Sequence, residues 1–417
     1  MTRALGFTGL LGGLLLGCGD SAGGGGPGPE LSSTSTATDG DTGATTTATT
    51  TTAADSSGTT GSTTSPTTGE DSTGQPPAEG SFWVFVSVQG RVSTWSMDPA
   101  TGALSFEREL PFDGPGGPLA VDPQQTTLYV AVRSADRADA FAIDPLTADL
   151  LPMGQVGLGL DPVYLRTDQT GRHLLTATFG GDQIAIFPIG DDGSLGGAAT
   201  QVLATPEEPH SILTDPSNQW LLVPHRTPDV IGQYAFDPTT GTATPNVVPQ
   251  VAAMPGSGPR HMVFHPDGDY AYVADEFSDR VSSYGFDAGT GQLTLMSTVS
   301  TLPEGFDGSA NTCADIHVTP DGRFVYVSNR GHDSLAMFAV DEGTGQLGSL
   351  GQVPTEARPR EFELSPRGRY AFAAGQDSNM MASYAIDQAT GMLSPGPVYD
   401  VGEEPLWVLA VELPPVP

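Results

Sequence analysis

The sequence predicts an all-β fold in which one unit of four short strands recurs seven times. An alternating strand ending in an acidic turn appears seven times after Phe82, at intervals of 46 to 54 residues. Between these copies lie short apolar strands joined by turns such as Pro-Asp-Gly at 266–268. The 54 glycines and 36 prolines, with 16% charged residues, favour tight turns over helices. We therefore expect a seven-bladed β-propeller over residues 81–417.

The first residues have the pattern of an export signal. Arg3 precedes an apolar run over residues 4–17, which is too short to span a bilayer of about 30 Å. Leu-Leu-Gly-Cys at 15–18 resembles the bacterial lipobox, in which the cysteine is lipidated. We expect a signal peptide over 1–17, a lipidated Cys18, and a protein anchored by lipid in the bacterial cell envelope. An ordinary signal peptide with an incidental cysteine is the alternative.

Residues 18–80 predict a disordered tether. They are mostly Gly, Ser, Thr and Pro, including the run Thr-Thr-Thr-Ala-Thr-Thr-Thr-Thr at 45–52, and they contain no apolar periodicity. Such a segment buries too little apolar surface to offset the entropy of ordering it. Cys313 is the only other cysteine, so no intramolecular disulfide framework is expected.

The charged residues exclude several functions. All 16 basic residues are arginines, which rules out Schiff-base chemistry, a P-loop lysine and a Ser-Lys dyad. A net charge of -33 makes nucleic acid an unfavourable partner.

The two termini are predicted to close the ring together. The first copy begins with Trp83–Val88 and has no inner strand before it, whereas the chain ends with an inner-type strand over 407–411 and nothing after it. We expect both to join one blade, which leaves no open sheet edge. A closed ring needs no partner chain, so we expect a monomer.

One face of such a propeller gathers many of the polar residues. It is formed by the loops that lead from each outer strand to the next blade and by the loops between the second and third strands of each blade; we call it the cleft face. Six of the arginines fall in these loops, namely Arg133, Arg226, Arg260, Arg330, Arg358 and Arg360. The otherwise acidic chain thus concentrates positive charge at one mouth of the central channel, where a small anion can bind.

Several motifs resemble those of the seven-bladed propeller lactonase family, which includes propeller-type 6-phosphogluconolactonases and fungal carboxymuconate lactonizing enzymes. They recur in order on successive blades and include Gly-Pro-Arg-His-Met-Val-Phe-His-Pro at 258–266, Tyr-Val-Ala-Asp-Glu at 272–276, Ala-Asp-Ile-His-Val-Thr-Pro-Asp-Gly at 314–322 and Ser-Asn-Arg-Gly-His-Asp-Ser at 328–334. The resemblance covers residues 82–413 and implies a lactone hydrolase.

The resemblance also implies a catalytic set. The family's histidine, two arginines and glutamate fall on His210, Arg260, Arg330 and Glu276. One position departs from the family, which usually has Asn where this chain has Asp275. A second carboxylate beside Glu276 is expected to raise the pKa of one of the two.

Lactone hydrolysis needs a base for water, donors for the oxyanion and cations for an acidic substrate. Glu276 or His210 is the expected base, and the arginines are expected to bind anionic oxygens. Further substrate contacts are expected from His261, Asp315, His317, His332, Arg360 and Gln376. The scheme requires no metal and no cofactor, and the partner is a small acidic lactone.

Other interpretations of the same residues remain open. A non-catalytic propeller that binds an acidic ligand, glycan or protein fits the same face. Arg260 and Glu276 also fit a salt bridge between blades, and Asp315 with His317 fits a His/Asp metal site. We expect Cys313, Trp95 and Trp407 to be packing residues and the blade aspartates to be turn residues.

Overall fold

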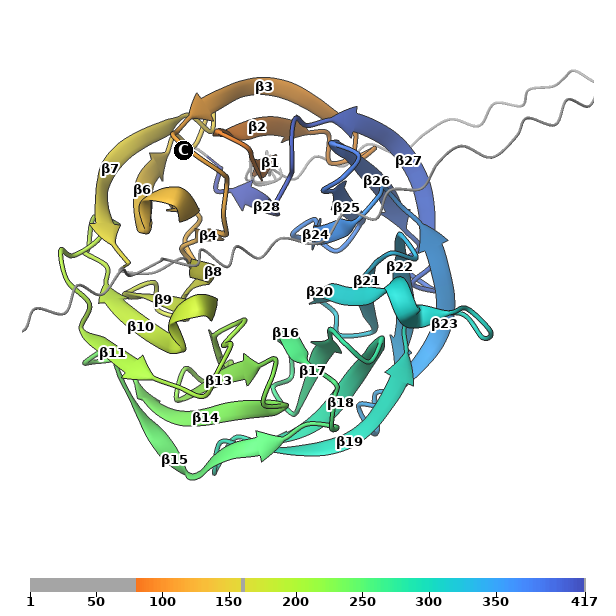
Figure 1. The fold of residues 1–417 in the computed structure, drawn as a ribbon. Helices are drawn as coiled ribbons and strands as arrows, with labels where there is room; N and C mark the ends of the chain where they lie inside the picture. Colours follow the sequence, from red (N-terminus) through yellow and green to blue (C-terminus); the bar gives the residue numbers. More distant parts are fainter. Residues whose placement is uncertain (1–79, 159–161, 416–417) are drawn as a thin grey trace, which may run out of the picture. The chain divides into compact units, whose positions relative to one another are not determined.

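The computed structural model describes residues 80–158 and 162–415 and is a ring of seven four-stranded antiparallel sheets around a central axis (Figure 1). The predicted propeller is confirmed. The predicted signal peptide, Cys18 and almost all of the tether lie outside the described residues. Within the described ranges, no helix has the length and apolar character needed to cross a membrane.

The first four blades each run from an inner strand at the channel to an outer strand. The first consists of β28 (Trp407–Leu413), β1 (Ser81–Val88), β2 (Arg91–Met97) and β3 (Leu104–Pro111). The second consists of β4 (Leu119–Val121), β5 (Thr127–Val132), β6 (Arg137–Ile143) and β7 (Leu150–Gly157). The third consists of β8 (Pro162–Thr167), β9 (His173–Thr178), β10 (Gln183–Pro188) and β11 (Gln201–Ala204). The fourth consists of β12 (Leu213–Thr214), β13 (Trp220–His225), β14 (Val230–Asp237) and β15 (Thr242–Ala252).

The remaining three blades follow the same order. The fifth consists of β16 (Pro259–Phe264), β17 (Tyr270–Asp275), β18 (Arg280–Asp287) and β19 (Gln292–Ser300). The sixth consists of β20 (Thr312–Val318), β21 (Phe324–Arg330), β22 (Ser334–Val340) and β23 (Leu347–Pro354). The seventh consists of β24 (Pro359–Leu364), β25 (Tyr370–Gly375), β26 (Met380–Ile386) and β27 (Leu393–Asp400). Short 3-10 turns occur at Arg133–Ala135, Phe179–Gly181 and Gly308–Ala310.

The ring closes as predicted. β28 pairs antiparallel with β1 from Ser81 opposite Leu413 to Ser87 opposite Trp407, so the last strand of the chain is the innermost strand of the first blade. Figure 1 shows β28 and β1 side by side in the ring. The two ends of the propeller are therefore joined by backbone hydrogen bonds rather than by side-chain packing alone.

The repeated aspartates are turn residues, as predicted. In the turn after β18, the Asp287 carboxylate accepts hydrogen bonds from the Gly289 backbone N–H at 2.9 Å and the Thr290 hydroxyl at 2.8 Å. These bonds lower the pKa of Asp287. Gly291 has φ of +67°, which a residue with a side chain rarely adopts. The carboxylates are therefore used to shape turns and are not free to act in catalysis.

The core lies between blades rather than in one central mass. Between the sixth and seventh blades, Tyr326, Met337, Phe362 and Tyr384 pack together and are almost fully buried. Trp95 belongs to the cluster between the first and seventh blades, so it is a packing residue as predicted. Because apolar side chains fill the spaces between sheets, the inner strands can present polar side chains to the channel.

Candidate active site

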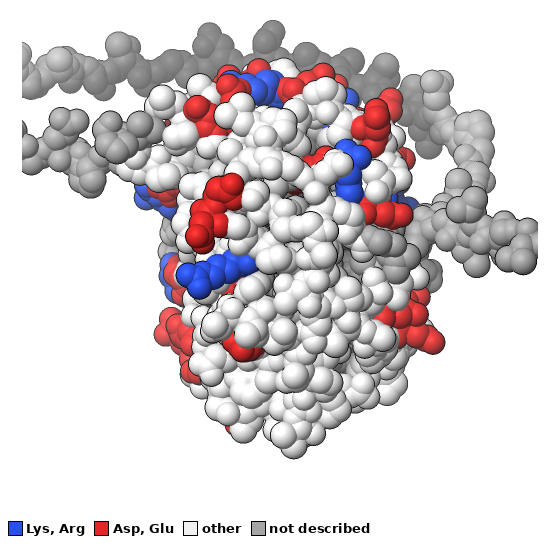
Figure 2. Space-filling model, turned by 90° about the vertical axis from the view of Figure 1, so that its left-hand side faces the viewer, with Lys and Arg blue, Asp and Glu red and all other residues white. Residues whose placement is uncertain are grey.

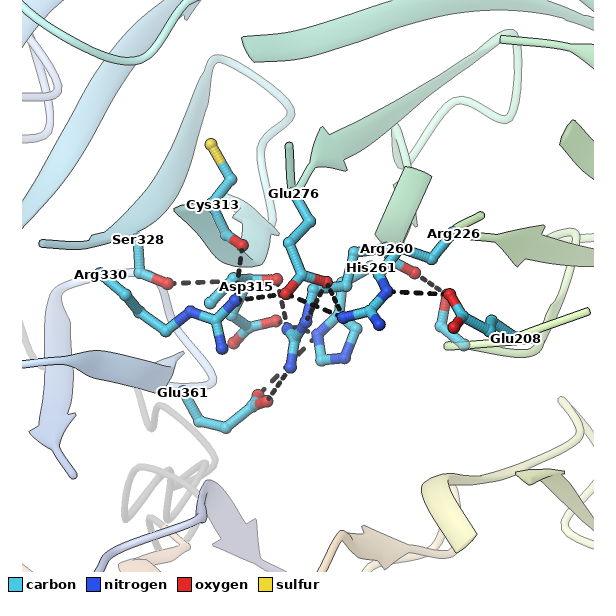
Figure 3. Close-up of polar contacts among 12 residues, drawn as sticks. Glu208, Arg226, Arg260, His261, Glu276, Cys313, Asp315, Ser328, Arg330 and Glu361 are labelled. Atoms are coloured by element: carbon cyan, nitrogen blue, oxygen red, sulfur yellow. Dashed lines mark hydrogen bonds and ion pairs between the residues drawn. The ribbon is translucent and has the colours of Figure 1, made fainter. Parts of the chain in front are cut away.

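Glu276 is the centre of the charged site on the cleft face (Figure 3). It follows β17, and its side chain is only 7% exposed. Arg330 Nη2 lies 2.6 Å from Glu276 Oε1, and Arg226 Nη1 lies 3.2 Å from both carboxylate oxygens. Arg260 Nε lies 3.7 Å from Oε2. Three guanidiniums from three successive blades therefore meet at one carboxylate.

The alternative interpretation of Arg260 and Glu276 as a bridge between blades is wrong in its details. Arg260 lies on β16 and Glu276 follows β17, so both belong to the fifth blade. The contacts that cross between blades are made by Arg226 of the fourth blade and Arg330 of the sixth. Sequence reasoning had placed Arg226 on this face without including it among the site residues.

The electrostatics of Glu276 are set by these arginines. Burial alone would raise its pKa, but the neighbouring charges of Arg260, Arg330 and Arg226 outweigh burial and lower the pKa to about 2. Glu276 is therefore ionised at neutral pH and is a weak proton acceptor while the arginines are otherwise unoccupied. Its first role is to hold the guanidiniums in place.

Asp275 lies next to Glu276 in the chain, but its side chain lies in a different environment. It is fully buried, and Oδ2 accepts a hydrogen bond from the Ser282 hydroxyl at 2.5 Å, whereas Oδ1 has no partner. Burial raises the pKa of Asp275 to about 7. The predicted rise is thus present, but its cause is loss of solvent rather than repulsion from Glu276.

His210 borders the same site from the loop before β12. It is buried, and its ring lies 5.4 Å from that of His261 and 5.7 Å from that of Phe179. Burial and the positive charge of Arg260 lower the pKa of His210 well below its ordinary value, so the imidazole is neutral. His210 Nδ1 is buried without a hydrogen-bond partner. A neutral ring with an unused nitrogen can accept a proton from water or bind a substrate hydroxyl.

Positive charge exceeds negative charge around Glu276. We call Arg226, Arg260, Arg330 and Arg360 the arginine cluster. Arg226 also pairs with Glu208 at 3.1 Å. Burial together with the charges of Arg260 and Arg330 lowers the pKa of Arg360 to about 9. Because a guanidinium keeps its proton at neutral pH, this shift measures how unfavourably its charge is placed until an anion arrives.

Three predicted substrate contacts face the central channel instead. His261 and Asp315 are buried, with His261 Nδ1 2.8 Å from Asp315 Oδ1, and His317 Nε2 lies 2.9 Å from Asp315 Oδ2. Glu363 and Asp315 outweigh the effect of burial and raise the pKa of His317 to about 9. Each carboxylate oxygen of Asp315 thus contacts one histidine, below the arginine cluster.

Two other predicted contacts, His332 and Gln376, contact neighbouring loops of the cleft face. The His332 ring accepts or donates a hydrogen bond with the Ser334 hydroxyl at 2.7 Å and packs on Phe306. Gln376 donates its backbone N–H to the Arg358 carbonyl at 3.0 Å. These contacts hold the loops together.

Trp407 packs against two of the apolar clusters, as predicted, but it is not fully enclosed in the core. It is only half-buried, lines the channel, and packs edge-on against Tyr164 at 5.5 Å and near His261 at 5.9 Å. The inner strand of the first blade faces the channel as the other inner strands do, which the apolar sequence of β28 concealed. Cys313 is buried and inert, as predicted, because burial raises the pKa of its thiol.

Sequence reasoning missed Glu361 and Glu363 of β24. Glu361 is the third residue of β24, as His261 is of β16 and Tyr164 is of β8, and all three line the channel. Aligning the inner strands by their first proline would have found it. Since side chains alternate along a strand, the next residue but one, Glu363, lines the channel as well.

Comparison with known proteins identifies the family of this chain. Residues 85–410 match the family described as lactonase, 7-bladed beta-propeller. The chain belongs to that family. The 6-phosphogluconolactonase of Serratia proteamaculans is 36% identical over 318 residues, covering 76% of this chain and 95% of that protein. That of Pectobacterium carotovorum is 35% identical over 323 residues, covering 78% of this chain and 96% of that protein.

Solved structures agree with the family assignment. The periplasmic gluconolactonase of Pseudomonas aeruginosa superposes with a TM-score of 0.73 at 29% identity, covering 80% of this chain and all of that one. A 6-phosphogluconolactonase-like structure from Bacteroides fragilis superposes equally well, at 27% identity, over 82% of this chain and all of that one. The predicted fold and family are confirmed, and the family supports a lactone hydrolase over a non-catalytic binding propeller.

Proposed function

We propose that the chain hydrolyses the lactone of a sugar acid or related acid whose anionic group binds the arginine cluster. One observation carries this proposal: the guanidiniums of Arg226, Arg260 and Arg330 converge on the single carboxylate of Glu276. Buried like charges are unfavourable without counter-charge. A carboxylate or phosphate on the substrate supplies that charge, and arginine binds both groups in bidentate fashion.

The site residues divide the chemistry between them. The guanidiniums of the cluster bind the anionic group and stabilise the oxyanion that forms when water attacks the lactone carbonyl. His210, neutral and with Nδ1 unused, is placed to accept the proton of that water. A bound anion offsets the positive field at Glu276 and His210, which raises the basicity of both groups when substrate is present.

The test is hydrolysis of a lactone panel by the purified protein. Glucono-δ-lactone, 6-phosphogluconolactone and a muconolactone are followed by acid release, at a pH where spontaneous opening is slow. We expect Arg260→Ala to lower kcat/KM for anionic lactones by about 100-fold or more, as loss of an oxyanion donor does. If no lactone is opened above background, or if Arg260→Ala and Glu276→Gln lose nothing, the proposal is wrong.

We also infer that the propeller is held at the cell envelope by a lipid on Cys18. The apolar run that ends at this cysteine supports the inference, and multiple acyl chains anchor stably where a single chain does not. A substrate outside the cytoplasm favours an unphosphorylated acidic lactone. Mass spectrometry of the mature N-terminus checks the modification, and Cys18→Ser should release the protein from membranes.

A further inference from the structure

The central channel contains a cavity of about 620 Å³ below the arginine cluster. Its lining extends from Tyr164 and Trp407 to Pro123, Pro216 and Pro266, which stand in the turns between inner and second strands. These turns form the face opposite the cleft face. Trp407 also lines a smaller cavity that contains Arg360, so its indole forms part of the wall between the two ends.

Three side chains with metal-binding chemistry meet at the end of this cavity that lies beside Arg260. They are His261, Asp315 and Glu361, from the fifth, sixth and seventh blades, and we call them the channel triad. Their ligand atoms lie within 4.8 Å of one another, and all three side chains are buried. Figure 3 shows them converging beside Arg260 from separate strands. Three consecutive blades thus supply one nitrogen and two carboxylate donors to a single point.

The triad has buried acceptors without donors. Glu361 Oε1 and His261 Nε2 have no hydrogen-bond partner, and the two side chains are 3% and 2% exposed. Arg260 Nη2 lies 3.8 Å from Glu361 Oε1, beyond hydrogen-bond distance, and Arg260 Nη1 donates to the Ala314 carbonyl instead. Leaving buried acceptors unpaired is costly. The two unpartnered atoms are therefore available to an added electron-pair acceptor.

Carboxylates and basic groups both line the channel near the triad. Glu363, Asp122 and Asp168 line it together with Arg166 and with His317, which pairs with Asp315 and Glu363. The choice of ligand therefore rests on the donor atoms of the triad itself. One imidazole and two carboxylates are a donor set typical of Zn²⁺ or Mn²⁺, whereas Mg²⁺ and Ca²⁺ prefer oxygen alone. We propose that the channel triad of His261, Asp315 and Glu361 binds a divalent transition-metal ion whose remaining positions open into the channel. This goes beyond the sequence-based scheme, which required no metal.

The proposal differs from the earlier His/Asp alternative in its ligands. His317 is the histidine of that alternative, but its two ring nitrogens face Asp315 at 2.9 Å and Glu363 at 3.3 Å. It is therefore engaged on both sides, whereas His261 and Glu361 each retain a free acceptor.

The test is binding of Mn²⁺ or Zn²⁺ alone to the purified full chain after treatment with a chelator. Calorimetry in about 0.3 M NaCl, which screens the acidic surface, should show one ion per chain with a dissociation constant in the micromolar range. Glu361→Gln should weaken binding by about tenfold or more. The matched control is Glu363→Gln, which removes a channel carboxylate outside the triad and should change binding by less than about threefold.

A spectroscopic measurement identifies the ligands. Pulsed EPR of bound Mn²⁺ should show coupling to one imidazole nitrogen, and His261→Gln should remove it. The proposal is overturned if no stoichiometric binding occurs below about 1 mM, if Glu361→Gln binds as tightly as the unaltered chain, or if Mg²⁺ and Ca²⁺ bind more tightly than Mn²⁺ and Zn²⁺. If Asp315→Asn does not fold, the Glu361→Gln result decides the question.

Discussion

The two ends of the channel hold opposite chemistries although neighbouring residues build them. Arg260 belongs to the cluster around Glu276, whereas the next residue, His261, lines the channel. The same division separates Arg360 from Glu361. Side chains alternate along a strand, so one inner strand supplies both an anion-binding end and an acceptor-rich end. A shift of one residue is therefore enough to move a side chain from one site to the other.

The outer surface is different from both ends. Figure 2 shows one side of the propeller, where carboxylates stand singly or in small groups between uncharged areas and arginines are fewer. Residues 81–417 contain 41 acidic residues and 15 arginines, whereas Arg260 and Arg330, at the mouth, are buried.

The electrostatic difference between the two ends can be tested first by neutralising one carboxylate at each end. Glu276→Gln leaves the buried guanidiniums of Arg260 and Arg330 and the partly exposed one of Arg226 without their common partner, and we expect a loss of about 3–5 kcal/mol in the free energy of unfolding. Glu361→Gln should cost less than about 1 kcal/mol, because that carboxylate accepts no hydrogen bond at Oε1 and its pKa is already raised by burial. Urea denaturation in metal-free buffer measures both. Equal losses would show that the two ends are electrostatically alike.

A second test separates Asp275 from its neighbour. Asp275→Asn restores the residue that the family usually has, and at pH 8 we expect it to raise the free energy of unfolding by about 4 kcal/mol. The folded pKa of about 7 lies above the ordinary value of 3.8, so ionisation of Asp275 destabilises the folded chain as the pH rises between these values.

The gain should accordingly fall close to zero near pH 3, where Asp275 is protonated in the folded chain and mostly protonated in the unfolded chain. Denaturation curves at both pH values provide the check, and a gain independent of pH would contradict the assignment. Lactone hydrolysis should change little, because the Asp275 carboxyl group faces Ser282 rather than the arginine cluster.

The smallest expected effect concerns anions at the arginine end. Phosphate at about 100 times its dissociation constant should stabilise the chain by about 2.7 kcal/mol. Arg360→Met should weaken phosphate binding about tenfold and remove about 1.4 kcal/mol of that stabilisation. Arg358→Met, which alters a neighbouring arginine that is 28% exposed and lies 3.9 Å from Asp377, is the control. Thermal unfolding with and without phosphate measures this stabilisation in both variants. An equal loss of stabilisation in both would contradict the prediction.

Much of the fold was predictable because it is periodic. Seven acidic turns gave the number of blades, and the unpaired strands at each end of the repeats gave the closure by β1 and β28. The loops that meet on the cleft face also follow from the repeat, which is why Arg260, Glu276 and Arg330 are found together.

The residues that the sequence misplaced are those whose direction depends on the exact register of an inner strand. β16, β20 and β24 each contain an irregularity in their pairing near the cleft face, which locally interrupts simple alternation. His261 and Asp315, which the sequence assigned to the mouth, line the channel. Burial and its effect on Asp275 were also beyond the sequence, because they depend on packing by the neighbouring blade.

The pairing of β28 with β1 has a consequence for when the molecule can form. The strand that completes the first blade, β28, follows all the other strands of the ring in the chain, so the ring cannot close until β28 has been synthesised. Closure also joins residues more than 300 positions apart, which makes it a slow, late step. A chain truncated before Trp407 should therefore lack the inner strand that joins the two ends of the propeller.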